Sequence, residues 1–324
     1  MCTAVTYRTK DFYFGRNLDL HMSYNEGVTI TPRNFPFHFR CGKTLDHHYA
    51  IIGMATVVAD YPLYFDATNE KGLSLAGLNF PQNAAYYEKK EEKDNISPFE
   101  LIPWILGQCA TVAEALMKLE NMNLWNMPFD QHFPLSPLHW MLADRERCVV
   151  LEPMADGLKI HENPIGILTN NPPFDYHMYH LADFMNITPQ IPVNRFAAQL
   201  DLKPYSLGMG SIGLPGDLSS ASRFVKAAFT KLNSISGNSE SESISQFFHI
   251  LGSVAQQRGL TAIEERKYEF TLYSSCCNTD KGIYYYTTYE NSQITAVSMY
   301  KDDLEQQALI YYPLVKGQQI NFQN

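Results

Sequence analysis

The chain of 324 residues is long enough to bury a large core, and either one large domain or two compact ones would suit that length. Its net charge of −9 argues against a general attraction to nucleic-acid phosphate or to anionic lipid. Hydrophobic residues make up 45% of the chain and charged residues 18%, with 20 Tyr and 19 Phe, which indicates a globular protein rich in strand-forming aromatics.

The first third of the chain is predicted to be mostly strand. Cys2 to Tyr7 and Phe12 to Leu20 flank a polar turn, which predicts a β-hairpin that begins at the second residue. Because chain ends normally fray, a terminus held in a sheet is unusual. Further strands are predicted at Val28 to Pro32, Tyr49 to Val58 and Gly72 to Asn79.

The middle of the chain contains helix signals and a second group of strands. Ser97 before a proline predicts a helix that ends at Gly107, and Thr111 with Glu114 forms a capping box for a helix through about Glu120. Short apolar stretches alternate with turns over residues 138 to 168, which predicts another antiparallel sheet. Helical periodicity then predicts helices over 219 to 232 and 243 to 257.

The C-terminal part returns to strands, predicted at Tyr268 to Ser275, Ile283 to Tyr289 and Gln293 to Tyr300. Segregated blocks of strand and helix indicate an α+β fold of packed antiparallel sheets covered by helices. Residues 186–216 are rich in Pro and Gly and lack periodicity, so we interpret them as an excursion used in subunit contact.

The cysteines and the apolar runs indicate a cellular compartment. The six cysteines have neither the paired spacing of a zinc site nor the density of a disulfide scaffold. Charged residues at 8, 10 and 11 interrupt the place where a signal peptide would carry its apolar core, and the longest apolar run, Tyr49 to Ala59, is too short to cross a bilayer. We therefore expect a cytoplasmic protein that does not associate with membranes.

Cys2 is the first candidate for chemistry. Methionine aminopeptidase removes Met1 when a small residue follows, which would leave a thiol and a free α-amino group on one residue. A thiol has a pKa of about 8.5 and an α-amino group one of about 7.7 to 8.0, so the amine can accept the thiol proton near neutral pH. Many chains carry Cys at position two by chance; the strand that starts there is what favours a functional role.

Other polar residues carry weak signals on their own. Arg16 and Asp19 lie three apart in one predicted strand, so they are expected on opposite faces unless the strand bulges, and a surface ion pair is the simplest interpretation. Asn79, Asn170 and Arg223 stand near predicted element boundaries, where polar side chains often cap or turn the chain. The ten histidines lack metal-ligand spacing, so no metal site is predicted.

Several motifs together resemble one family. Met1-Cys2-Thr3 followed by the segment from Phe14 to Leu20 resembles the choloylglycine hydrolase family of bile salt hydrolases and penicillin V acylases. The likeness spans the chain through the segments 69–73, 76–80, 168–170, 213–217, 221–224 and 282–286. It implies a single N-terminal nucleophile hydrolase domain over 1–324, built as a four-layer αββα sandwich with two antiparallel sheets and usually assembled as a homotetramer.

The resemblance also implies a role for each site residue. Cys2 matches the nucleophile, with its own amine as the base, and Arg16 and Asp19 match positions that orient the amine and tune the thiol. For these two to lie beside Cys2 we expect a local bend in the strand. Asn79 and Asn170 match the oxyanion site, and Arg223 would add positive charge. The implied steroid pocket contains Leu18, Met22, Tyr24, Val58, Phe65, Phe129, Phe133 and Leu138, although by composition alone these residues would be ordinary core.

The expected reaction is hydrolysis of the amide that joins a bile acid to glycine or taurine, without a metal or an organic cofactor. Asn79 favours this activity within the resemblance, because penicillin V acylases often carry Tyr there. Penicillin V acylase or acyl-homoserine lactone acylase activity is the alternative. A non-catalytic protein that binds amphipathic ligands is an alternative of another class. Conjugated bile salts as partners imply a gut bacterium as the source.

Overall fold

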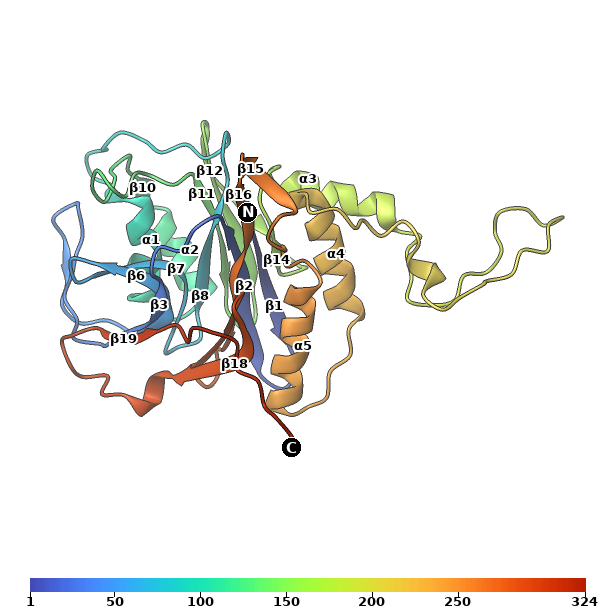
Figure 1. The fold of residues 1–324 in the computed structure, drawn as a ribbon. Coiled ribbons are helices and arrows are strands. Elements are labelled where there is room, and N and C mark those ends of the chain that lie inside the picture. The colour runs from blue at the N-terminus through green and yellow to red at the C-terminus, as the bar shows by residue number, and fades with distance from the viewer.

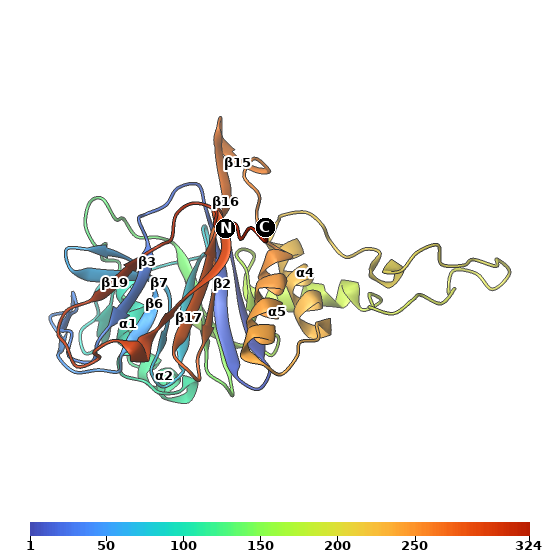
Figure 2. The same cartoon turned by 60° about the horizontal axis from the view of Figure 1, so that its bottom comes forward.

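Two antiparallel β-sheets lie face to face between helices in the computed structural model, which describes residues 1–324 (Figures 1 and 2). Helices α4 (Ser220–Asn233) and α5 (Glu240–Gly252) cover the outer face of one sheet, and α1 (Leu101–Leu106) and α2 (Val112–Leu119) lie on the side of the other (Figure 1). The result is the expected four-layer αββα order, with the N-terminal strand in the centre.

The first sheet has seven strands in the order β14-β1-β2-β16-β17-β18, with β15 added beside β16. Its strands are β1 (Cys2–Arg8), β2 (Phe12–Leu20), β14 (Ile167–Leu168), β15 (Thr261–Glu264), β16 (Lys267–Asn278), β17 (Ile283–Thr288) and β18 (Asn291–Ser298). The predicted hairpin of β1 and β2 is therefore confirmed, and its register pairs Cys2 with Leu18.

The second sheet has eight strands in the order β13-β12-β11-β8-β7-β6-β3-β19. Its strands are β3 (Gly27–Thr31), β6 (Ile51–Val58), β7 (Tyr61–Asn69), β8 (Ser74–Asn79), β11 (Leu138–Ala143), β12 (Cys148–Met154), β13 (Gly157–Glu162) and β19 (Ile310–Pro313). Two small sheets pair β4 (Phe37–His38) with β5 (Thr44–Leu45) and β9 (Asp94–Ile96) with β10 (Met122–Leu124).

The 3-10 turn before α1 and helix α2 begin at the caps that the sequence predicts. The α-helices are α1 (Leu101–Leu106), α2 (Val112–Leu119), α3 (Phe174–His180), α4 (Ser220–Asn233) and α5 (Glu240–Gly252), and a 3-10 turn, Pro98–Glu100, precedes α1. A capping box joins Ser97 to Glu100, and Thr111 accepts the backbone N–H of Glu114. These side chains satisfy backbone donors that a helix N-terminus leaves free.

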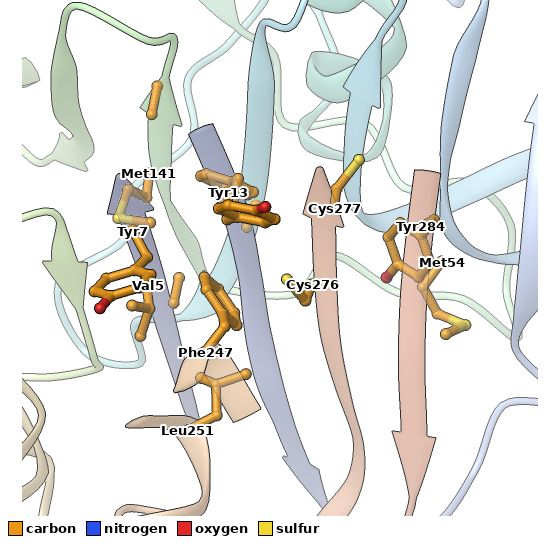
Figure 3. Close-up of a cluster of buried hydrophobic side chains, with 14 of the residues drawn as sticks. Val5, Tyr7, Tyr13, Met54, Met141, Phe247, Leu251, Cys276, Cys277 and Tyr284 are labelled. Carbon is orange, nitrogen blue, oxygen red and sulfur yellow. The ribbon is translucent and has the colours of Figure 1, made fainter. Parts of the chain in front are cut away.

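The cores of the sandwich follow from strand alternation. Successive residues Cys276 and Cys277 point to opposite faces of β16 (Figure 3). Phe247 and Leu251 of α5 pack on the outer face of the first sheet, near Val5 (Figure 3). All of them are buried, and this apolar packing holds β1 and β2 rigidly between α5 and the second sheet.

Several predicted boundaries were wrong. The helix expected over 243–257 runs from Glu240 to Gly252, because Ser239 and Glu242 form its capping box. On α2 the buried residues are Val112, Ala115 and Leu119, whereas Leu116 is only half-buried. Strand β7 and helix α3 were not predicted, and β14, expected in the sheet of the strands that precede it, pairs with β1.

Residues 186–216 extend away from the sandwich as a long arm, drawn in yellow-green to yellow (Figures 1 and 2). The arm contains no strand, and its only helical turn is Met209–Ser211. No helix in the structure is long and apolar enough to cross a membrane.

Candidate active site

Cys2 lies in the middle of the sandwich, at the start of β1. Its side chain is buried and lines a cavity of about 360 Å³, whose wall is formed by strands of both sheets and by residues near 98–102 and 129–136. Paired residues of an antiparallel ladder share a face, so Cys2 lies on the same face as Leu18 and, two residues further, Arg16. All three line the cavity.

The main chain of Cys2 is held by Asn170 and Arg223. The backbone N–H of Cys2 donates to Asn170 Oδ1 at 2.8 Å, because β14 pairs with β1 and brings the next residues alongside. Arg223, in the first turn of α4, donates to Cys2 O and Thr3 Oγ1, each at 2.6 Å, and to Asn170 Oδ1 at 2.8 Å. These bonds fix the position of the Cys2 nitrogen.

Met1 still precedes Cys2 in this chain, and it pairs with Asp19. The Met1 ammonium donates to Asp19 O and to Glu269 Oε2, both at 2.7 Å, and Asp19 N donates to Met1 O. The Asp19 side chain accepts from Thr271 Oγ1 at 2.7 Å, while its Oδ2 is buried without a hydrogen-bond partner, 4.0 Å from Arg223 Nη1. An unpaired buried carboxylate oxygen costs free energy. Asp19 Oδ2 can therefore still accept a hydrogen bond in this site.

Arg16 brings positive charge to the cavity face. Its Nη1 donates to Phe65 O at 3.0 Å and to Gly77 O, while Nη2 is buried without a partner. Burial opposes the charge, but Cys2, Tyr273, Asp66 and Asp19 outweigh it and raise the pKa of Arg16. The guanidinium therefore stays charged and keeps one donor group without a partner, on the lining of the cavity that Cys2 also lines.

Charge on the other side of Cys2 is balanced between Asp19 and Arg223. Burial raises the pKa of Asp19, and the neighbouring Arg223 pulls it down. Burial also lowers the pKa of Arg223, against the pull of Asp19 and Cys2. The two groups compensate each other inside the protein.

The local bend expected to bring Arg16 and Asp19 to one face is absent. Arg16 faces the second sheet, where it contacts β7 and β8, whereas Asp19 faces Arg223 of α4. The register irregularity lies in the partner strand β16, between Thr271 and Tyr273, and not in β2. Both faces of the first sheet are covered, so the two side chains are buried on opposite sides of it.

The cavity brings together most of the residues expected to form an apolar pocket. The structure places six of them on its lining: Leu18, Tyr24, Phe65, Phe129, Phe133 and Leu138. Tyr24 contacts the rings of Phe65 and Phe133, each with centroids 6.4 Å apart. Met22, which is 49% exposed, and Val58 do not line the cavity. Asn79 lines it, and Asn79 O accepts from Asn170 Nδ2 at 2.7 Å.

Further lining residues were missed by the sequence analysis, although strand alternation points to some of them. Leu20, Gly77 and Trp140 each lie two residues from a predicted site residue on the same strand, so they share its face. Phe99 and His132 come from a 3-10 turn and from a loop, where no periodicity marks the inward side.

The sequence matches one family of hydrolases over nearly its whole length. Residues 2–312 match the family described as linear amide C–N hydrolases, choloylglycine hydrolase family. The chain belongs to the choloylglycine hydrolase family. Similar relatives include the bile salt hydrolase/transferase of Lactiplantibacillus plantarum, 56% identical over 97% of each chain, and that of Clostridium perfringens, 39% identical over 100% of each.

Solved structures agree with the fold. The crystal structure of a C2A mutant of the conjugated bile acid hydrolase from Clostridium perfringens superposes with a TM-score of 0.93 at 37% identity, over 100% of each chain. The penicillin V acylase from Agrobacterium tumefaciens gives a TM-score of 0.76 at 20% identity, over 97% of this chain and 92% of its own. The N-terminal nucleophile hydrolase sandwich is therefore the fold of this chain.

Proposed function

We propose that this protein hydrolyses the amide bond between a bile acid and glycine or taurine, with Cys2 as the nucleophile once Met1 is removed. The observation that carries the proposal is the position of the Cys2 thiol, buried at the wall of a largely apolar cavity. Such a cavity suits a steroid face, and a few polar groups suffice to orient the ligand. The names of the bile salt hydrolase relatives support this substrate class.

The mechanism follows from the contacts of the Cys2 nitrogen. Removal of Met1 would turn the backbone nitrogen into an amine that still reaches Asn170 Oδ1 and frees the groups of Asp19 that now hold Met1. The amine takes the thiol proton, the thiolate forms a bond to the carbonyl carbon, and the amine then gives its proton to the leaving glycine or taurine. Water releases the bile acid from the thioester.

Two asparagines are assigned to the negative charge of the oxyanion, and one arginine to that of the thiolate. Asn170 Nδ2 uses one hydrogen on Asn79 O and keeps a second for the oxyanion, together with the Asn79 side chain at the cavity wall. Removing one such donor typically costs about 3 to 4 kcal/mol of transition-state stabilisation. Arg16, charged and adjacent to the thiol, favours the thiolate.

The test compares the parent protein with Cys2→Ser on glycocholate and taurocholate, measuring the released amino acid. We expect hydrolysis by the parent and loss of most activity in the variant, because an alcohol is a much weaker nucleophile than a thiolate at neutral pH. Mass spectrometry of the N-terminus is the control. A parent that begins at Cys2 and releases neither glycine nor taurine would contradict the proposal, as would full activity in Cys2→Ser.

The same assays separate the alternatives. A specificity constant for penicillin V well above that for conjugated bile salts would favour acylase activity. A non-catalytic binder would show no turnover, and its Cys2→Ala variant would bind bile salts as the parent does.

We further propose that residues 1–324 form one domain, that the protein assembles as a homotetramer, and that it acts in the cytoplasm of a gut bacterium. The arm of residues 186–216, with its many exposed apolar side chains, supports subunit contact. All six cysteines are free thiols, which suits a reducing compartment.

A further inference from the structure

A group of buried histidines lies behind the Asn170 segment, outside the cavity. His139 of β11 and His177 of α3 are fully buried, and Glu152 of β12 lies between the elements that carry them. None of the three lines the cavity, and the proposed mechanism uses none of them.

His177 holds the carbonyl of Asn170. Its Nε2 lies 2.9 Å from Asn170 O, and because a carbonyl only accepts, this nitrogen must carry the hydrogen. Burial lowers the pKa of His177 to about 4, so the ring is neutral and its Nδ1 remains without a partner. The ring stacks on Phe224, the residue after Arg223, with centroids 4.7 Å apart.

His139 contacts the preceding carbonyl and, unlike His177, has a partner at each ring nitrogen. Its Nε2 lies 2.9 Å from Thr169 O, and its Nδ1 lies 3.1 Å from Glu152 Oε1. The same carboxylate oxygen accepts the backbone N–H of Phe174, the first residue of the helix that carries His177. The ring stacks on Phe80 with centroids 4.3 Å apart. The contacts at its two nitrogens and on this face of the ring fix its orientation.

Asn170 is thereby fixed along its main chain as well as at its side chain. Its backbone N–H donates to Ser220 Oγ at 2.8 Å, and its carbonyl accepts from His177. Between these two anchors its side-chain Oδ1 meets both the Cys2 nitrogen and Arg223. A shift of the carbonyl would therefore move the group that orients the proposed base.

We propose that His177 and His139 are positioning residues, which hold the Thr169–Asn170 main chain so that Asn170 Oδ1 meets the nitrogen of Cys2. This inference rests on the proposed role of the Cys2 amine. Small displacements in a catalytic arrangement can cost roughly 100-fold in rate, so the effect belongs mainly to kcat.

Three substitutions at His177 test the donor. His177→Phe keeps a ring beside Phe224 but has no donor, His177→Asn has an amide too short to reach, and His177→Gln carries an amide at nearly the reach of Nε2. We expect kcat on glycocholate to fall roughly 10- to 100-fold in the first two with KM nearly unchanged, and His177→Gln to recover most of the rate. If His177→Phe does not fold, the inference is tested by comparing His177→Asn with His177→Gln.

His48 supplies a matched control. It is also buried, lies 2.7 Å from Tyr49 O and 2.9 Å from Phe35 O, and packs against the ring of Phe37, but it does not line the cavity. His48→Phe should lower the melting temperature as the His177 variants do and leave kcat unchanged. An equal loss of kcat in His48→Phe would show a general loss of packing and overturn the inference.

The alkylation rate of Cys2 by iodoacetamide, followed against pH by mass spectrometry, separates this inference from the proposed function. We expect the pH profile to shift in His177→Asn but not in His177→Gln, whether or not the protein hydrolyses bile salts. If the profile shifts in this way but bile salts are not hydrolysed, the proposed substrate is wrong and the positioning role stands. An unchanged profile and an unchanged kcat in His177→Asn would overturn the positioning role while the hydrolase proposal stands.

Discussion

Single buried residues couple the stability of this protein to pH. His177 has its pKa lowered by burial from 6.5 to about 4. Between these values the unfolded chain binds a proton that the folded chain does not, so stability rises with pH in this window and falls as the solution is acidified. The loss from this one side chain reaches about 3 kcal/mol below pH 4, since each unit of pKa shift is worth about 1.4 kcal/mol.

We therefore expect the urea midpoint of the parent protein to fall between pH 6.5 and 4, and that of His177→Gln to fall less. Glutamine cannot take up the proton, so the difference between the two curves isolates this residue from the carboxylates that also titrate there. Equilibrium unfolding followed by tryptophan fluorescence at several pH values measures it. Parallel curves for the two proteins would contradict the assignment.

At the same scale, the residues around Cys2 show what the sequence could predict. Strand spacing alone indicated opposite faces for Arg16 and Asp19, and the structure has them there. The bend we expected came from assuming that both residues must touch one group, whereas they lie on opposite faces of the first sheet. His139 and His177 carried no signal, because their partners are backbone carbonyls, which no residue type marks in the sequence.

The elements of the fold form where local signals agree, and their ends are set by caps. Helix α5 illustrates this, since apolar periodicity placed its start at 243 while the Ser239–Glu242 capping box starts it at Glu240. The sequence contains that box, but a polar first turn hides it from an analysis of apolar spacing. Strands whose pairing depends on residues far along the chain, such as β14 with β1, could not be assigned to a sheet from sequence.

The cap of α5 makes a local prediction. Ser239→Ala removes the acceptor for the backbone N–H of Glu242 and should lower the free energy of unfolding by about 1 kcal/mol. Ser239→Asp keeps an acceptor and places negative charge at the helix N-terminus, so it should lose little or nothing. Thermal unfolding of both variants measures the difference, while activity should stay unchanged because the cap contacts no cavity residue. Equal melting temperatures for the two would contradict the role of the cap.

On the scale of the whole molecule, the arm of residues 186–216 is the feature that the sandwich alone does not explain. Apolar side chains on the surface of a monomer are usually scattered, whereas large exposed apolar patches mark interaction sites. The arm concentrates several of them, including Phe196 at 82% and Leu207 at 85% exposure, on a segment without strands of its own. Such a segment gains its stability from what it packs against, which we propose is another copy of this chain.

The double substitution Phe196→Asp and Leu207→Asp tests this assembly, because burying two carboxylates in an apolar contact costs several kcal/mol. Size-exclusion chromatography with light scattering should show a tetramer for the parent and a smaller species for the variant. Ile235→Asp is the matched control, since Ile235 is 91% exposed but lies between α4 and α5, outside the arm; its mass should equal that of the parent. A monomeric parent, or an unchanged mass in the double variant, would show that the arm does not hold the subunits together.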